Sequence, residues 1–213
     1  MREKILDDIR NALMKGDRGS VSALTKQAVE QGLEIRDVMD NALVAAMEVV
    51  GGKFKRSEIF IPEVLISAKA MHAGMAVLEP HFTKHGIKPV GRVVIGTVKG
   101  DLHDIGKNIV SMMLKGGCFE IDDLGIDVSP QKFVDAARAK DVNILAMSSL
   151  LTTSMNAMRD TISALKAAGI RDKVKVMVGG APVTQDFASA IGADGYAKDA
   201  ASAVDKAKEL LQK

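Results

Sequence analysis

The residues best suited to chemistry in this chain are a histidine and the two aspartates on either side of it. Asp101, His103 and Asp104 lie in segment 96–108, which also contains three glycines. A neutral imidazole is a good metal ligand, and a carboxylate that accepts its other ring N–H fixes the tautomer and raises the basicity. Side chains two residues apart on an extended loop project to the same side, so we expect Asp101 to be the partner of His103. Asp104 is then the expected cap of a helix starting near Ile105.

The glycines of this segment do not form a known phosphate-binding motif. Gly100 and Gly106 are one residue too far apart for Gly-x-x-x-x-Gly-Lys-Ser/Thr, and Asn108 stands where that motif needs a hydroxyl. Gly-x-Gly-x-x-Gly does not occur here either. Nucleoside triphosphate chemistry is therefore disfavoured. Taken alone, the segment also allows a plainer interpretation, in which both aspartates are helix caps and His103 is an ordinary loop residue.

The elements that must position these residues are short apolar runs alternating with helical stretches. The runs are 92–98, 119–123, 143–147 and 174–178, with a weaker fifth at 194–196. Runs without alternation predict strands buried on both faces, and strand–helix repetition predicts a doubly wound parallel sheet. Ligands bind beyond the carboxyl ends of such strands. Three polar segments follow strands one, three and four, at 96–108, 148–154 and 179–182, so they should meet at one edge.

The first 88 residues have helical periodicity instead. Apolar residues recur every three or four positions, and glycines at 16–19, 32 and 51–52 are expected to separate the helices. A fourth helix should open near Pro62 and end before Pro80. Four helices with short connections predict an antiparallel bundle. We therefore predict a helical domain at 1–88 and an α/β domain at 89–213, joined by a linker between His85 and Gly91.

The composition sets limits on the protein's class. With 47% hydrophobic and 26% charged residues among 213, the chain is expected to fold by burial. A single cysteine, Cys118, allows no intramolecular disulfide and fits a reducing compartment. A net charge of +2 does not favour nucleic acid. No continuous apolar run approaches the roughly 20 residues of a membrane span, and the start lacks a signal-peptide core. We expect a cytoplasmic protein without a nucleic-acid or membrane partner.

Three motifs, taken together, resemble those of a known family. Asp101-x-His103-x-x-Gly106, Ser148-x-Leu150 and Gly179-Gly180 follow one another in the order and spacing of cobalamin-binding domains of the methionine synthase type. In the first half, Gly51-Gly52-Lys53-Phe54, segment 58–63 and Met71 are similar to that family's four-helix cap. The whole chain resembles the methyltransferase cognate corrinoid proteins that serve methylamine, methanol, glycine betaine and methoxyaromatic methyltransferases. The fold implied is a four-helix cap followed by a flavodoxin-like, five-stranded parallel sheet that binds cobalamin.

The resemblance implies roles for residues at the site. It implies cobalamin bound base-off, with its dimethylbenzimidazole detached and His103 as the cobalt ligand. His103, Asp101 and Ser154 would form the catalytic hydrogen-bonded relay, and Ser148 would contact the detached base. The cofactor-contacting residues that it implies are Asp101, His103, Asp104, Ile105, Gly106, Ser148, Leu150, Thr152, Ser154, Gly179, Gly180 and Phe60.

Plainer alternatives remain for several of these positions. Ser154 could be the N-cap of a helix starting near Met155. Each glycine could be an ordinary turn residue rather than a point where the backbone approaches the nucleotide tail. Phe60, with Phe54 and Leu65 behind it, could belong to the core of the bundle rather than shield the upper cobalt face.

The function implied is that of a methyl carrier, which is not a complete catalyst alone. Cobalamin, as methylcobalamin or hydroxocobalamin, would take a methyl group from a substrate-specific methyltransferase. A second methyltransferase would pass it to tetrahydrofolate or a thiol, and a reductive activase would be a further partner. The alternatives are a small subunit of an adenosylcobalamin-dependent mutase, which usually lacks a helical cap, and a cobalamin-sensing regulator, which would need a DNA-binding segment.

Overall fold

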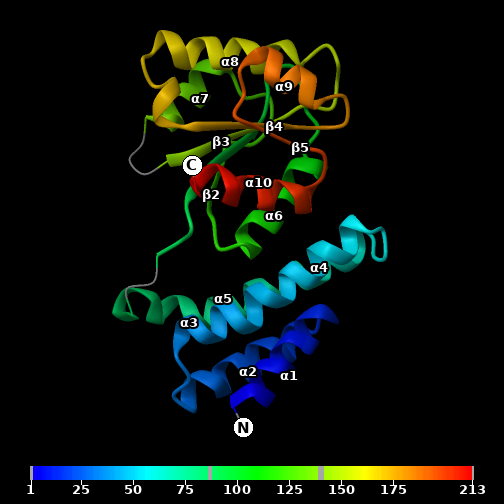
Figure 1. Ribbon diagram of the computed structural model, residues 1–213, viewed down its shortest axis with the longest axis vertical. Helices are drawn as coiled ribbons and strands as arrows, with labels where there is room; N and C mark the ends of the chain where they lie inside the picture. The colour runs from blue at the N-terminus through cyan, green and yellow to red at the C-terminus, as the bar shows by residue number, and fades with distance from the viewer. Residues whose placement is uncertain (1, 86–87, 139–141, 213) are drawn as a thin grey trace. The chain divides into compact units, whose positions relative to one another are not determined.

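The computed structural model describes residues 2–85, 88–138 and 142–212, which fold into two compact units (Figure 1). One unit comprises Met1–Pro89 with Gly116–Cys118, and the other comprises Val90–Lys115 with Phe119–Lys213. Each unit has its own core and is described by itself. The expected linker between His85 and Gly91 includes residues 86–87, which lie outside the described residues.

The first unit is a bundle of helices that pack closely around small residues. Its elements are α1 (Arg2–Met14), α2 (Arg18–Glu30), α3 (Ile35–Val38), the π-helix η1 (Met39–Val44), α4 (Ala45–Lys55) and α5 (Ile61–His85). The segments α3, η1 and α4 follow one another without a break and form one continuous helix. With α1, α2 and α5, the described part of this unit therefore contains four helices. A Cβ added at Gly74 of α5 would lie 2.7 Å from the Leu43 side chain and 3.0 Å from that of Val21. The glycine therefore lets α5 approach η1 and α2, and the predicted four-helix bundle is confirmed.

Two predicted helix boundaries in this unit are wrong. Gly51 and Gly52 lie inside α4, which continues to Lys55. Glycine costs about 1 kcal/mol in a helix, but Gly51 is buried, and packing there outweighs the low propensity. Pro80 lies inside α5, which continues to His85. The carbonyl that Pro80 leaves without its helical N–H belongs to Ala76, which is exposed, so water can satisfy it.

The length of continuous apolar runs in the sequence did not reveal how long and apolar helix α5 is. From Ile61 to Phe82 it is long and apolar enough to cross a membrane, judged by length and composition alone. Polar residues such as Ser67 and Lys69 interrupt the apolar sequence, so no single run revealed this. The buried side chains of α5 belong to the bundle core, and the helix packs against α2 and α4. The central helix of a bundle passes the same test of length and hydropathy.

The second unit is a five-stranded, fully parallel sheet with strand order β2-β1-β3-β4-β5. The strands are β1 (Arg92–Thr97), β2 (Glu120–Asp123), β3 (Val142–Ser148), β4 (Lys175–Gly179) and β5 (Gly195–Ala197). The helices are α6 (Ile105–Gly116), α7 (Pro130–Ala137), α8 (Asn156–Ala167), η2 (Arg171–Lys173), α9 (Gln185–Ile191) and α10 (Ala200–Gln212). In Figure 1, α7, α8 and α9 cover one face of the sheet, and α6 and α10 the other. The predicted doubly wound, flavodoxin-like fold is confirmed.

This strand order creates a switch point where β1 and β3 end. From β1 the chain moves outward to β2 and then returns to β3 on the other side, so the loops after β1 and β3 leave toward opposite faces. Thr97 pairs with Ser148, and Ser148 pairs with Gly179, so three strand ends lie side by side. The polar segments that follow these strands therefore begin at the same edge, as the sequence predicted.

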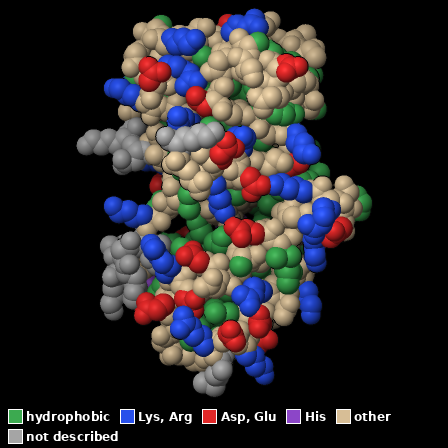
Figure 2. Space-filling model, in the orientation of Figure 1, with side chains coloured by type: hydrophobic (Ala, Val, Ile, Leu, Met, Phe, Trp, Pro, Cys, Tyr) green, Lys and Arg blue, Asp and Glu red, His purple; other side chains and the backbone are tan. Residues whose placement is uncertain are grey.

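Charged side chains of both signs are scattered over the face of the molecule that Figure 2 shows. On the face that Figure 2 shows, Lys and Arg side chains are interspersed with Asp and Glu side chains in both units. The near balance of 29 basic and 27 acidic residues in the sequence is thus distributed rather than segregated on this face.

The loop after β3 rests directly on the loop after β4. The Ser149 N–H donates to the Gly179 carbonyl at 3.2 Å. Gly180 has a φ of +130°, and a Cβ added there would lie 1.8 Å from the Ser149 carbonyl oxygen. No side chain fits at that distance, so Gly180 is required by the protein's own backbone. Because Gly180 has no side chain, the Ser149 backbone can lie against it, and residues 149–151 can follow this path.

We predict that Gly180→Ala lowers the free energy of unfolding by about 3 kcal/mol, because it combines an unfavourable φ with a backbone clash. Gly169→Ala is the matched control: its φ is +68° and its Cβ would meet nothing within 4 Å. That variant should lose only about 1 kcal/mol. Urea denaturation of both variants measures the difference, and equal losses would contradict the role given to the Ser149 carbonyl.

Candidate functional site

The site is built on the turn that follows β1. The Asp101 N–H closes this turn onto the Val98 carbonyl at 3.1 Å, and Gly100 within it has a φ of +83°. The Thr97 hydroxyl, fully buried, donates to the His103 carbonyl at 2.8 Å. The backbone on both sides of Asp101 is thereby held against the end of β1.

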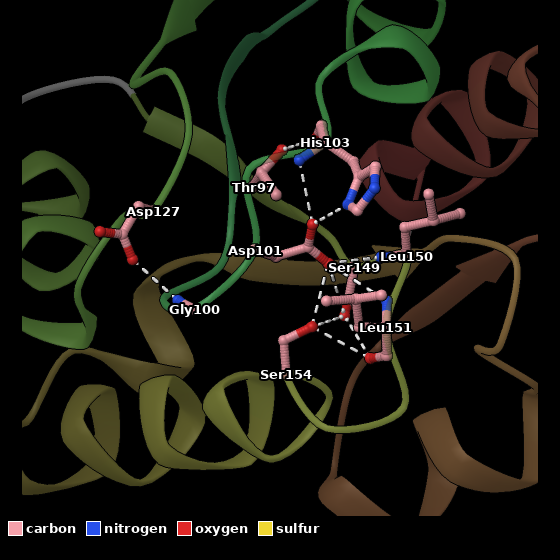
Figure 3. Close-up of polar contacts among 9 residues, drawn as sticks. All are labelled: Thr97, Gly100, Asp101, His103, Asp127, Ser149, Leu150, Leu151 and Ser154. Carbon is pink, nitrogen blue, oxygen red and sulfur yellow. Dashed lines mark hydrogen bonds and ion pairs between the residues drawn. The ribbon is translucent and has the colours of Figure 1, made fainter.

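Asp101 and His103 form the pair that the sequence predicted (Figure 3). Oδ1 of Asp101 accepts from the backbone N–H of His103 at 3.0 Å and lies 2.7 Å from Nδ1 of its ring. Asp101 is fully buried, whereas the His103 side chain is 51% exposed. A carboxylate only accepts hydrogen bonds, so Nδ1 is the donor in this contact, and in the neutral ring Nε2 then carries the lone pair. Nε2 makes no hydrogen bond to any residue that the structure describes, so it is available as a ligand.

The second oxygen of Asp101 is bound by the loop after β3. Oδ2 accepts from the backbone N–H of Leu150 at 2.7 Å and of Leu151 at 3.2 Å, and from the Ser154 hydroxyl at 3.0 Å. Burial alone raises the pKa of Asp101. The N–H groups of His103 and Leu150, the His103 ring and the Ser154 hydroxyl outweigh it and hold the pKa well below its ordinary value. Asp101 is therefore a carboxylate, tied to both loops.

Two serines meet at this carboxylate, and the sequence identified only one of them. The alternative in which Ser154 is an N-cap is wrong, because α8 begins at Asn156 and its cap residue is Met155. Ser149 was missed: it is fully buried, and its Oγ lies 2.7 Å from Ser154 Oγ and 3.4 Å from Asp101 Oδ2. The only sequence signal was its position inside Ser148-x-Leu150.

Asp104 has a different place from Asp101, as expected. Its carbonyl accepts the first helical hydrogen bond of α6, from the Asn108 N–H at 2.8 Å. Its carboxylate accepts from the Asn108 side-chain amide at 3.0 Å. Asp104 thus immediately precedes α6, which starts at Ile105 as predicted, and its carboxylate is bound by the Asn108 side chain.

The remaining predicted contacts lie at the same edge of the sheet or in the other unit. Ser148 ends β3, Gly179 ends β4, and Thr152 is exposed in the loop between Leu151 and Ser154. Phe60 belongs to the helical unit, where it immediately precedes α5 and is 64% exposed. It is therefore not a buried core residue of the bundle.

The surroundings of His103 fit a large apolar cofactor that brings its own metal. Four exposed apolar residues lie in or next to the two loops of the site. Leu102 and Ile105 lie within two residues of His103 in the chain, and Leu150 and Leu151 donate their backbone N–H groups to its carboxylate partner. A Cβ at Gly106 would meet nothing within 4 Å, so no protein atom accounts for a glycine there. Within residues 2–85, 88–138 and 142–212, no cluster of three or more His, Cys, Asp or Glu could hold a bare metal ion. One imidazole fits a metal whose other ligands come from a macrocycle.

Comparison with known proteins agrees with this geometry. A family described as "B12 binding domain" matches residues 91–205, and a second family with the same description matches residues 5–79. Dimethylamine corrinoid protein 1 of Methanosarcina mazei is 45% identical over 99% of this chain and 97% of its own length. A corrinoid protein of Desulfitobacterium hafniense is 41% identical over 98% of both chains.

Solved structures give the same result for the fold. A chain of the methanol:cobalamin methyltransferase complex MtaBC from Methanosarcina barkeri is 31% identical and superposes with a TM-score of 0.87, covering 100% of this chain and 81% of its own. A cobalamin-binding protein from Desulfitobacterium hafniense is also 31% identical, with a TM-score of 0.82 over 96% of this chain and 98% of its own. Both halves of the chain thus have counterparts, and the resemblance seen in the three motifs is confirmed: the chain belongs to the B12-binding corrinoid protein family.

Proposed function

We propose that this protein carries a methyl group on a bound corrinoid, taking it from a substrate-specific methyltransferase and presenting it to a second methyltransferase. The observation that carries the proposal is the half-exposed His103 ring, whose Nδ1 is tied to a buried carboxylate and whose Nε2 is left as a ligand. Two relatives named dimethylamine corrinoid proteins, which this chain matches over 97% or more of their length, support a carrier role.

The helical unit favours a methyl carrier over the alternatives. An adenosylcobalamin mutase subunit would need the α/β unit alone, yet residues 5–79 also match a B12-binding family. The complex in which one structural relative occurs is described as a methanol:cobalamin methyltransferase, which supports a methyltransferase as partner. The second methyltransferase, with tetrahydrofolate or a thiol as acceptor, and a reductive activase belong to this proposal, as does a cytoplasmic location.

Particular residues would hold the cofactor. His103 would be the cobalt ligand with the cofactor base-off. Ser148 and Gly179 at the strand ends, with Thr152 in the loop after β3, would line the space for the detached base. Gly106, where no protein atom fills the place of a Cβ, would lie against the corrinoid together with Ile105 and Leu150. Phe60, exposed on the helical unit, would be a further contact of the cofactor.

The chain's own residues would orient the ligand and manage its proton. When bound, the corrinoid supplies the cobalt that accepts and releases the methyl group. Asp101 holds the His103 ring through Nδ1 and keeps the lone pair on Nε2. The same hydrogen bond holds the Nδ1 proton on the side that faces Asp101, so the neutral ring would offer Nε2 to the cofactor. Ser154 and the Leu150 N–H keep Asp101 ionised throughout.

The proposal predicts that the apoprotein mixed with hydroxocobalamin forms a tight complex whose absorption spectrum is that of a base-off, histidine-ligated corrinoid. In His103→Ala the histidine-ligated spectrum should be lost, and cobalamin binding should weaken by at least about tenfold. His81→Ala, in α5 of the helical unit, is the control and should behave as the unaltered protein. Retention of the histidine-ligated spectrum in His103→Ala would mean that the ligand is wrongly assigned.

The carrier role is tested by the form of the cofactor that reacts. Protein loaded with methylcobalamin should lose its methyl group to a thiol or tetrahydrofolate in the presence of an acceptor methyltransferase, as followed by the change in visible absorption. Protein loaded with adenosylcobalamin should not react. Reaction of the adenosyl form alone would support the mutase alternative instead.

Asp101→Asn should lower the free energy of unfolding of the apoprotein by about 2 kcal/mol at pH 7. The amide NH₂ must face either the donors of His103 or those of the loop after β3, so one group of buried donors loses its acceptor. Because the folded-state pKa of Asp101 is depressed, its stabilisation is complete above the ordinary carboxyl pKa near 4 and is lost as pH falls below it. Urea denaturation at several pH values should show the difference between variant and unaltered protein shrinking below about pH 4. A constant difference down to pH 2 would contradict this.

A further inference from the structure

Asp127, in the loop between β2 and α7, makes two hydrogen bonds to the turn that carries the site. Its Oδ1 accepts from the Gly100 N–H at 2.7 Å, and its own N–H donates to the Asp101 carbonyl at 3.1 Å. Figure 3 shows that it reaches the turn from the side away from His103. Asp127 therefore touches neither the imidazole nor the Asp101 carboxylate. It holds the backbone of Asp101, from which that carboxylate projects, and of the preceding Gly100.

The turn needs such a clamp because of its glycine. Gly100, with a φ of +83° and no side chain, has far more backbone freedom than any other residue type. The Asp101 carboxylate must nevertheless present Oδ1 to His103 and Oδ2 to the loop after β3 at the same time. Asp127 binds both the N–H of Gly100 and the C=O of Asp101, and these two hydrogen bonds together restrict the movement of this backbone segment.

The residue that makes the clamp is itself firmly placed. Thr97 donates its N–H to the Gly125 carbonyl at 3.0 Å, and the Val128 N–H donates to the Thr97 carbonyl at 2.9 Å. The end of β1 is thus bonded to the loop on both sides of Asp127. Asp127 has a φ of +50°, a left-handed conformation that aspartate and asparagine tolerate better than other residues with side chains. The neighbouring hydrogen bonds stabilise this strained backbone conformation.

We propose that Asp127 is a positioning residue for the metal ligand: by clamping Gly100 and Asp101, it sets the orientation of the His103 ring. The inference rests on the proposed function of His103, but it concerns a residue outside the three motifs. A purely structural role for Asp127 would affect only the stability of the turn. A positioning role predicts in addition that loss of the clamp changes the orientation of the His103 imidazole.

Three substitutions separate the hydrogen bond from the charge and from the backbone conformation. Asp127→Asn removes the charge but keeps an acceptor oxygen and tolerates positive φ. Asp127→Gly keeps the conformation and removes the acceptor. Asp127→Ala removes the acceptor and also strains the backbone. Comparison of the asparagine and glycine variants therefore isolates the hydrogen bond to Gly100.

The first measurement uses the apoprotein. Nitrogen-15 NMR of the His103 ring reports which nitrogen carries the proton. The unaltered protein and Asp127→Asn should both show a ring protonated at Nδ1. Asp127→Gly and Asp127→Ala should show mixed tautomers, and Asp127→Ala should in addition unfold at the lowest temperature. Because Asp127→Gly and Asp127→Ala lack the same acceptor but differ in strain, agreement of their ring signals separates positioning from stability.

The second measurement uses protein loaded with hydroxocobalamin. The ratio of histidine-ligated to unligated cofactor should fall about tenfold in Asp127→Gly and stay within about twofold of the unaltered protein in Asp127→Asn. Ring signals and ligation ratios unchanged in Asp127→Gly, with only a lower unfolding temperature, would overturn the proposal. Equal losses in the asparagine and glycine variants would also overturn it, because charge would then be the cause. Absence of histidine ligation in the unaltered protein would refute the proposed function instead, and the apoprotein ring signals would still decide on the clamp.

Discussion

A carboxylate without solvent contact imposes the main constraint on the α/β unit. An unpaired buried ion costs several kcal/mol, so Asp101 can remain ionised only if both of its oxygens are bound. One oxygen is bound by His103 and the other by the loop after β3, so a single side chain holds together two segments about 50 residues apart in sequence. The orientation of the His103 ring follows from this arrangement.

The fold supplies this arrangement at a switch point, where loops from neighbouring strands diverge and their first residues are close. The contact requires the loop after β3 to turn back so that the N–H groups of Leu150 and Leu151 face Asp101. Gly180 makes that path possible, since Ser149 occupies the place of its side chain. A Cβ added at the neighbouring Gly179 would meet only the Ala197 carbonyl oxygen, at 3.0 Å. Of the two adjacent glycines, Gly180 is therefore the one on which the loop depends.

The sequence predicted the strands, their parallel order and the Asp101–His103 pair, because these follow from local apolar runs and from residues close in the chain. It did not predict the course of α4 through Gly51 and Gly52, because packing can outweigh helix propensity. It also missed Ser149 and Asp127, whose roles depend on contacts between distant loops. Serine and aspartate are common in loops, so their type and position alone did not distinguish these two from their neighbours.

The combination of one exposed imidazole with apolar surroundings restricts the kind of metal that this edge can bind. A free ion would need several protein ligands, and the described part of the chain offers no such cluster here. Under the proposed function, a metal already held in a macrocycle would need one further ligand from the protein, and Nε2 of His103 would supply it. His103 is half-exposed, and its ring is held through Nδ1, so a change in the orientation of the ring would leave the strands undisturbed. Asp101 is anchored by hydrogen bonds from both loops, so it would hold the ring in one orientation toward a bound metal. The proposed carrier function would use this arrangement, in which a rigidly held carboxylate fixes the orientation of a half-exposed imidazole and leaves its Nε2 without a partner among the described residues.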